Sequence, residues 1–284
     1  MGHAQIGTTG LSFLKLGVSG RALGMGEAYA AVASDPAATY YNPSALSLIE
    51  KPQLLFSHKE WIQGAKTEFI AGAVPLGDLT VGIGVNATSV NDIELRDVPG
   101  PPLATFSARN TSIGISAAYI IDTTFYIGAT GKFLYEKILV YDASGFGADV
   151  GGTYKTPWDV RVGLSVSNLG SVNKLENVST KLPVIVRFGG MHQRTIESFD
   201  GTLTIAFDVV SVSGEKKAHP HIGAEMNFKQ AFAVRAGYQG GYEGKNVSAG
   251  VGIHYDLLHV DYAYVPFQYD LGTTHTISLI IDFH

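Results

Sequence analysis

The chain has 284 residues, a formal net charge of −5 at pH 7 and a charged fraction of 16%, below the usual fraction of about 25%. This acidic balance offers no basic surface for nucleic acid, so no nucleic-acid partner is expected. Because the chain has no cysteine, disulfides, thiolate metal sites and thiol nucleophiles are excluded. Its length is compatible with one all-β barrel domain.

No run of about 18 consecutive apolar residues occurs, which excludes a transmembrane helix. A signal peptide is not recognisable either. Residues 1–5, MGHAQ, look like a start appended to a mature chain, because Ala-Gln is a plausible product of signal cleavage. We therefore expect an exported protein whose signal peptide has been removed or replaced.

Residues 17–46, GVSGRALGMGEAYAAVASDPAATYYNPSAL, are the least strand-like part of the chain. Small residues from Glu27 to Ala33 predict a helix of one or two turns, which Asp35-Pro36 would end. The next residues, 40–43, predict a turn with two aromatic side chains. An alanine and glycine helix cannot build a core of its own, so this stretch is predicted to be buried inside the rest of the chain.

The chain after residue 52 contains only strand-length segments with period-two alternation. About fourteen strands are predicted, at residues 53–62, 66–76, 78–90, 108–121, 124–137, 144–156, 158–168, 183–195, 201–212, 219–229, 231–240, 245–256, 258–267 and 273–283.

The alternation favours a membrane barrel over a soluble β-sandwich. In the last strand, one face carries Ile277, Leu279, Ile281 and Phe283, while small polar residues dominate the opposite faces of most strands. A sandwich would expose a richly charged face to water, whereas apolar side chains pointing outward suit lipid. The prediction is an all-β, antiparallel transmembrane β-barrel of about 14 strands (residues 49–284), with residues 1–48 as a hatch, or plug, in the lumen.

Connection lengths predict an orientation. Every second connection is short, whereas the others include the two longest, at residues 90–107 and 168–183. Outer-membrane barrels have short periplasmic turns and longer external loops. Both termini are therefore expected on the periplasmic side.

A thin set of charged or titratable residues has inward parity in the predicted strands. Strand pairing about the short turns predicts three contacts, Glu225 with Arg235, Arg187 with Asp208, and His254 with Asp261. We interpret the set as cross-strand ion pairs of a polar lumen wall; the alternatives are a selectivity ring or a hydrolase site. The set comprises Lys132, Asp149, Arg161, Arg187, Asp208, Glu225, Arg235, His254 and Asp261.

Polar contacts between plug and wall are predicted for Asn42 and Arg21, with Asp149 or Asp261 as the partner of Arg21; the alternative is an Arg21 solvated in the lumen. Inward glycines would let the plug backbone approach the wall closely. These glycines are Gly82, Gly84, Gly114, Gly128, Gly163, Gly250 and Gly252. The plug motif itself comprises Arg21, Gly24, Gly26, Asp35, Pro36, Tyr40, Tyr41, Asn42 and Pro43.

Catalytic, metal and cofactor sites are not predicted. His219 and His221 share a strand face, but no third metal ligand can be named. The chain has no GxSxG, Walker or dinucleotide motif in the required strand–turn–helix context. We therefore expect a protein that is not an enzyme and uses no cofactor.

Three motifs resemble a known family. They are LKLGVSGRALGMGEAYAAVASDPAATYYNPSAL at residues 14–46, VDYAYVPF at 260–267 and ISLIIDF at 277–283. Together they resemble the PorV/PorQ family, within the FadL-like group of fourteen-stranded outer-membrane barrels. The resemblance implies a bacterial outer-membrane barrel with a lumenal hatch, whose closing strand, with Ile277, Leu279, Ile281 and Phe283, is read during membrane insertion.

Two functions follow from the resemblance. PorV-type members are implied to serve type IX protein secretion or surface attachment, with a secretion translocon or secreted cargo as partners besides the lipid bilayer. FadL-type relatives are implied to move hydrophobic small molecules through the barrel wall. The expectation from the sequence is the secretion role, because the predicted inward residues are mostly small and polar; the hydrophobic conduit is the alternative.

Overall fold

The computed structural model describes residues 10–96, 100–175 and 180–283. The start sequence on which the expectation of a removed signal peptide depends lies outside these residues.

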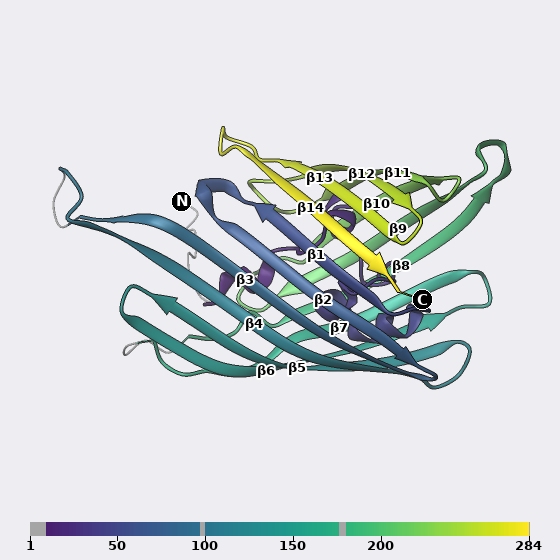
Figure 1. The fold of residues 1–284 in the computed structure, drawn as a ribbon, viewed down its shortest axis with the longest axis horizontal. Coiled ribbons are helices and arrows are strands. Elements are labelled where there is room, and N and C mark those ends of the chain that lie inside the picture. Colours follow the sequence, from purple (N-terminus) through teal and green to yellow (C-terminus); the bar gives the residue numbers. More distant parts are fainter. Residues whose placement is uncertain (1–9, 97–99, 176–179, 284) are drawn as a thin grey trace.

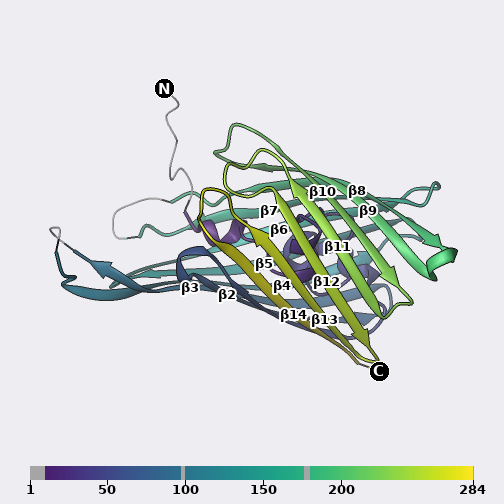
Figure 2. The ribbon, with the colours of Figure 1, turned by 90° about the horizontal axis from the view of Figure 1, so that it is seen from above.

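Fourteen antiparallel strands close into one barrel in which each strand pairs with its neighbours in the chain and β14 pairs with β1 (Figures 1 and 2). The predicted fold is therefore confirmed, and most observed strand bounds lie close to those predicted from the alternation of apolar and polar residues. The strands are β1 (Gln53–Glu60), β2 (Lys66–Leu76), β3 (Leu79–Leu95), β4 (Ala104–Ile120), β5 (Phe125–Ile138), β6 (Tyr141–Lys155), β7 (Val160–Val172), β8 (Ile185–Ile196), β9 (Gly201–Val212), β10 (His219–Phe228), β11 (Phe232–Gln239), β12 (Val247–Tyr255), β13 (Leu258–Pro266) and β14 (Thr273–Asp282).

Strands β3 and β4 are longer than predicted. Their ladder continues to the pair Leu95 and Ala104, with a register shift between Val90 and Ile93 where Asp92 adopts a φ of 56°. The predicted connection at residues 90–107 is therefore mostly strand. The resulting hairpin projects beyond the neighbouring strands (Figure 1).

The two ends of the barrel differ. The short-turn end contains the turns that follow β2, β4, β6, β8, β10 and β12, and the long-loop end contains the other connections. At the short-turn end Phe283 donates its backbone N–H to Pro52. The first described residue, Gly10, instead bonds to the carbonyl of Lys181 at the long-loop end. The two chain ends of the barrel itself thus lie on one side, as predicted, whereas Gly10 lies at the other end. The N-terminus of the chain lies outside the described residues.

Residues 10–49, here called the N-terminal segment, lie inside the barrel, in contact with strands on opposite sides of the wall (Figure 2). The segment contains η1 (Ser12–Lys15), α1 (Gly20–Gly24), α2 (Ala38–Tyr41) and η2 (Pro43–Leu48). Almost all of its apolar side chains are buried. Within the described residues, no helix has both the length and the apolar character needed to cross a bilayer.

The helix predicted at residues 27–33 is wrong. Helix α1 comes earlier and ends where Gly26 and Glu27 adopt φ values of 62° and 58°. Residues 28–33 form irregular backbone with one turn at residues 30–32, because the N–H groups of Tyr29 and Ala30 donate to the Asp208 side chain on β9 instead of to helical carbonyls. Asp35 begins the next helical turn by accepting the N–H of Ala37 at 2.9 Å.

The core lies inside the barrel, between the N-terminal segment and inward side chains. Tyr29 and Tyr41 pack edge to face with ring centroids 5.2 Å apart, and Phe69 of β2 contacts Tyr40 at 6.4 Å. On the outer face the apolar residues are exposed, as Ile277 at 53% and Ile115 at 69% illustrate. The barrel thus carries apolar side chains outward and packs its own N-terminal segment within.

Candidate functional site in the lumen

A buried ion network joins the N-terminal segment to the wall. Arg21 contacts both carboxylate oxygens of Glu225, with Nε–Oε2 at 2.9 Å and Nη2–Oε1 at 2.8 Å. Arg235 joins Glu225 to Asp261 through bonds of 2.5 and 2.6 Å. The predicted contact between Glu225 and Arg235 is present, but the predicted partner of Arg21 is wrong, because Asp261 is occupied by Arg235.

Arg21 also approaches Asp35 within its own segment, at 3.8 Å. The hydroxyl of Tyr29 hydrogen-bonds to the same carboxylate. Burial raises the pKa of Asp35, and the nearby Arg21 opposes that rise. The segment is therefore held by a cation that bridges a carboxylate of its own and one of the wall.

A second anchor comes from β9. Asp208 is fully buried and accepts the N–H groups of Tyr29 and Ala30, both at 2.8 Å. The predicted contact between Asp208 and Arg187 is wrong, because Arg187 stands opposite Val210 in the register and Asp208 opposite Gly189.

The third anchor is Asn42, whose side chain donates to the carbonyl of Ala30 at 2.8 Å and to the hydroxyl of Thr153 on β6 at 3.2 Å. A side chain at Gly128 of β5 would meet the backbone of Pro43 at 2.5 Å. Asn42 therefore contacts the wall as the sequence predicts.

Close backbone approach explains several of the predicted inward glycines. Added Cβ atoms would contact the N-terminal segment at Gly82, Gly84, Gly128, Gly163 and Gly250, whereas at Gly114 and Gly252 they would contact wall side chains. Gly24 of the segment lies on Gly250, and Gly26 approaches the backbone of Tyr238. These positions bring two backbones together where any larger residue would separate them.

Among the remaining predicted lumen residues, Lys132 and Asp149 form an ion pair, whereas His254 lacks its predicted partner. Lys132 pairs with Asp149 at 2.5 Å, and Asp149 also accepts the N–H of Asn168 at 2.8 Å, where β7 departs from regular pairing at a φ of 65°. His254 does not contact Asp261 as predicted; it packs on His259 with centroids 4.4 Å apart. The described residues contain no group of three His, Asp or Glu side chains that could hold a metal ion.

A cavity of about 220 Å³, here called the long-loop cavity, lies between the N-terminal segment and the wall at the long-loop end. Its apolar lining comes from Leu16, Trp61, Ile185, Val210 and Val212, and its polar lining from Lys15, Glu27, Arg187, Glu215, His221, Tyr242 and Lys245.

Glu27 is the centre of the polar side of this cavity. It accepts from Gln239 at 3.0 Å and from Lys245 at 3.2 Å. Burial alone would raise the pKa of Glu27, but Lys245, His221 and Gln239 lower it to about 2. Glu27 is thus an ionised carboxylate with its hydrogen-bonding partners in place.

This cluster around Glu27 was not predicted from the sequence. Lys59 is buried beside it, donates to the carbonyl of Gly17 at 2.6 Å and lies 5.0 Å from the ring of Trp61. The parity of β1, which turns Leu55, Ser57 and Lys59 inward, contains the signal that places Lys59 in the lumen.

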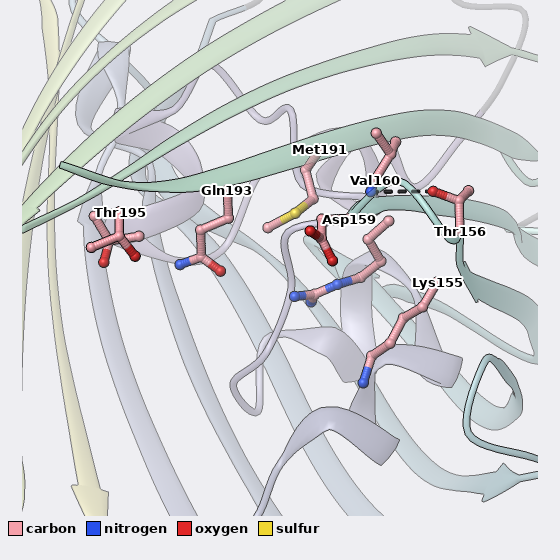
Figure 3. Close-up of a pocket in the computed structure, with 9 residues that line it drawn as sticks. Lys155, Thr156, Asp159, Val160, Met191, Gln193 and Thr195 are labelled. Carbon is pink, nitrogen blue, oxygen red and sulfur yellow. Dashed lines mark hydrogen bonds between the residues drawn. The ribbon is translucent and has the colours of Figure 1, made fainter.

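A second cavity, of about 450 Å³, opens at the short-turn end and is here called the short-turn cavity. Its lining includes Lys155, Met191, Gln193 and Thr195 (Figure 3). The predicted lumen charge Arg161 also lines it, with Nη1 lacking a partner among the described residues. Polar groups surround this cavity, whereas the long-loop cavity combines polar groups with a broad apolar wall.

Solved structures with the same architecture include proteins named as transporters and channels. The toluene transporter TbuX of Ralstonia pickettii is 16% identical, with a TM-score of 0.69 over 94% of this chain and 99% of that chain. The chain has the FadL-like barrel fold. A toluene transporter of Pseudomonas putida, TodX, is 13% identical with a TM-score of 0.66, covering 93% and 97% of the two chains.

A FadL homologue of Pseudomonas aeruginosa matches with 13% identity and a TM-score of 0.57, covering 94% of this chain and 98% of that one. No protein-family model matches the sequence, and no curated protein matches it either. At these identities the likeness concerns the FadL-like fold, and the resemblance to PorV and PorQ proteins receives no support from it.

Proposed function

We propose that the protein is a bacterial outer-membrane conduit for hydrophobic small molecules, and not an enzyme. The observation that carries the proposal is the long-loop cavity, a partly apolar chamber of about 220 Å³ between the wall and a segment that fills the lumen. An apolar cavity of about 150 Å³ can hold benzene, so the volume suits a molecule with one ring. This reverses the preference drawn from the sequence, which favoured type IX secretion.

Two further features support a conduit. The fold is shared with proteins named as toluene transporters and as a monoaromatic hydrocarbon channel. The outward faces of the strands expose aliphatic and aromatic side chains, which suits a lipid bilayer as partner. Residues 1–48, which include nearly all of the N-terminal segment, are proposed as the hatch of a barrel formed by residues 49–284, with the long-loop end outside the cell.

An uptake experiment tests the proposal. Cells that lack their own hydrocarbon channels would express the chain and be given radiolabelled toluene. We expect faster accumulation than in cells without the chain, and a reduced rate for Trp61→Ala, which removes an apolar wall of the cavity. The chain's other tryptophan, Trp158, is 78% exposed in a short turn, and Trp158→Ala is the matched control.

Uptake equal to that of cells without the chain would contradict the proposal. If, in addition, the native protein co-purified from outer membranes with a secretion complex, the secretion interpretation would replace it.

A further inference from the structure

The long-loop cavity contains a buried cation that no carboxylate of the described residues contacts directly, although Glu27 and Asp208 act on it at longer range. Arg187 is 4% exposed and forms no ion pair within the described parts of the chain. The other two cations of the lining are paired, Lys15 with Glu215 and Lys245 with Glu27, each at 3.2 Å. Because a buried charge without a partner is costly, this site favours an incoming anion.

Two tyrosine rings of the N-terminal segment hold Arg187 in place. Its guanidinium carbon lies 5.6 Å from the ring centroid of Tyr40 and 5.4 Å from that of Tyr41. These cation–π contacts, together with a side-chain hydrogen bond to Tyr40, orient the guanidinium. The fork geometry of arginine then matches a carboxylate, which can accept two parallel N–H bonds.

A second polar group lacks a partner beside it. His221 is 3% exposed and lines the same cavity. Its Nε2 contacts the Tyr242 hydroxyl at 3.2 Å and its ring interacts with the backbone of Glu27, but its Nδ1 has no well-formed hydrogen bond among the described residues. Buried polar atoms are normally satisfied. A ligand with oxygen atoms would satisfy this one.

The apolar wall lies directly beside Arg187. Ile185 is two residues away on the same face of β8, and the register places Val210 opposite Arg187 and Val212 opposite Ile185 on β9. Trp61 and Leu16 complete the apolar side. The cavity therefore has a cationic group and an apolar surface within the length of one small molecule.

We propose that the long-loop cavity binds small carboxylates that carry a single apolar ring, with Arg187 receiving the carboxylate and Ile185, Val212 and Trp61 contacting the ring. This inference rests on the proposed conduit function and narrows its substrate class from hydrophobic molecules in general to aromatic anions. The volume of about 220 Å³ excludes a long extended chain from complete burial here.

Binding of two matched probes tests the proposal. The purified full-length protein in detergent would carry Trp158→Phe, so that Trp61 is the single fluorescent reporter. Benzoate is the anionic probe and benzyl alcohol its neutral counterpart. We expect benzoate to bind more tightly, Arg187→Gln to weaken benzoate binding by about tenfold or more, and benzyl alcohol binding to change less than about twofold.

Two variants complete the experiment. Arg187→Lys keeps the positive charge without the fork and should give an intermediate benzoate affinity. Arg161→Gln, which removes an arginine of the short-turn cavity, is the matched control and should leave benzoate binding unchanged. If Arg187→Gln does not fold, the affinities of benzoate and benzyl alcohol are compared between the protein that retains Arg187 and the Arg187→Lys variant. A loss of affinity in Arg187→Lys that is confined to benzoate would still support the site.

The outcomes separate the two proposals. Equal affinities for benzoate and benzyl alcohol, or equal losses of both in Arg187→Gln, would overturn the aromatic-anion site while toluene uptake leaves the conduit standing. Absence of binding by either probe, together with absence of toluene uptake, would overturn both.

Discussion

Arg21 of the N-terminal segment and Glu225 of β10 form a two-bonded ion pair across the lumen, with N–O distances of 2.9 and 2.8 Å. Glu225 also accepts from Arg235, so a single carboxylate holds two guanidinium groups. We expect Glu225→Gln to lower the free energy of unfolding by about 3–5 kcal/mol, because it removes the anion that Arg21 and Arg235 share and leaves Arg21 with only the more distant Asp35.

Urea unfolding in detergent measures this effect. Arg21→Gln should cost less, because Glu225 keeps Arg235. The control is Arg96→Gln, which removes an exposed pair with Glu94 and should change the free energy of unfolding by no more than about 1 kcal/mol. Equal losses for Glu225→Gln and Arg96→Gln would contradict the structural role of the network.

Two glycines of β5 provide a matched pair. A Cβ at Gly128 would lie 2.5 Å from the backbone of Pro43, whereas one at Gly131 would meet nothing within 4 Å. Gly128→Ala is expected to cost about 1–3 kcal/mol of unfolding free energy, because the N-terminal segment must shift. Gly131→Ala should stay within about 0.5 kcal/mol. Similar unfolding curves for both variants would show that the segment does not pack on β5.

Arginine substitutions test which face meets lipid. Leu279→Arg on the outer face of β14 should cost about 2–4 kcal/mol if this position lies near the bilayer midplane. Ser278 is unsuitable as the inward control, because it is buried and accepts the N–H of Gly20 at 2.8 Å. Thr195→Arg, in the short-turn cavity, is the better control and should be tolerated. Folding yields in lipid bilayers check both, and equal losses would refute the assignment of faces.

The lowered pKa of Glu27 predicts that the stability of the folded protein depends on pH. Its pKa is lowered to about 2 in the folded protein from an ordinary value of 4.5, despite burial, by Lys245 and its other partners. A lowered carboxylate pKa adds stability that is complete above the unfolded pKa and disappears as pH falls through the folded one. Between about pH 4.5 and pH 2, Glu27→Gln should therefore lose less stability than the unaltered protein. The exposed Glu50→Gln should follow the unaltered protein, and a Glu27→Gln curve of the same slope would contradict this assignment.

Deletion of residues 6–46 tests whether the N-terminal segment closes the lumen. A barrel of fourteen strands is wider than the eight-stranded barrels that side chains alone can fill, so its lumen must hold water or chain. We expect the shortened protein to fold and to conduct ions in planar bilayers where the full-length protein does not. The same conductance from both proteins would exclude a closing role.

The candidate site was predictable where local strand pairing decides the contact. Glu225 and Arg235 stand opposite each other on strands joined by a short turn, and parity with a turn position identifies such a pair. The predicted contact between Arg187 and Asp208 was wrong because the observed register offsets the two residues by two positions. The partner of Arg21 could not be predicted from the sequence, because a lumenal segment can contact any strand of the wall.

The amino-acid pattern was sufficient to predict about fourteen strands, the faces they turn inward and outward, and the burial of an alanine- and glycine-rich segment, because each depends on periodicity or composition within one stretch of chain. The path of that segment depends instead on contacts with distant strands. Residues 28–33 have helical composition, yet Asp208 draws the N–H groups of Tyr29 and Ala30 out of the helical pattern. The long-loop cavity has the same origin. Strands β8, β9 and β10, the β1–β2 and β11–β12 connections and the N-terminal segment are distant in the chain and meet there only once the barrel has closed.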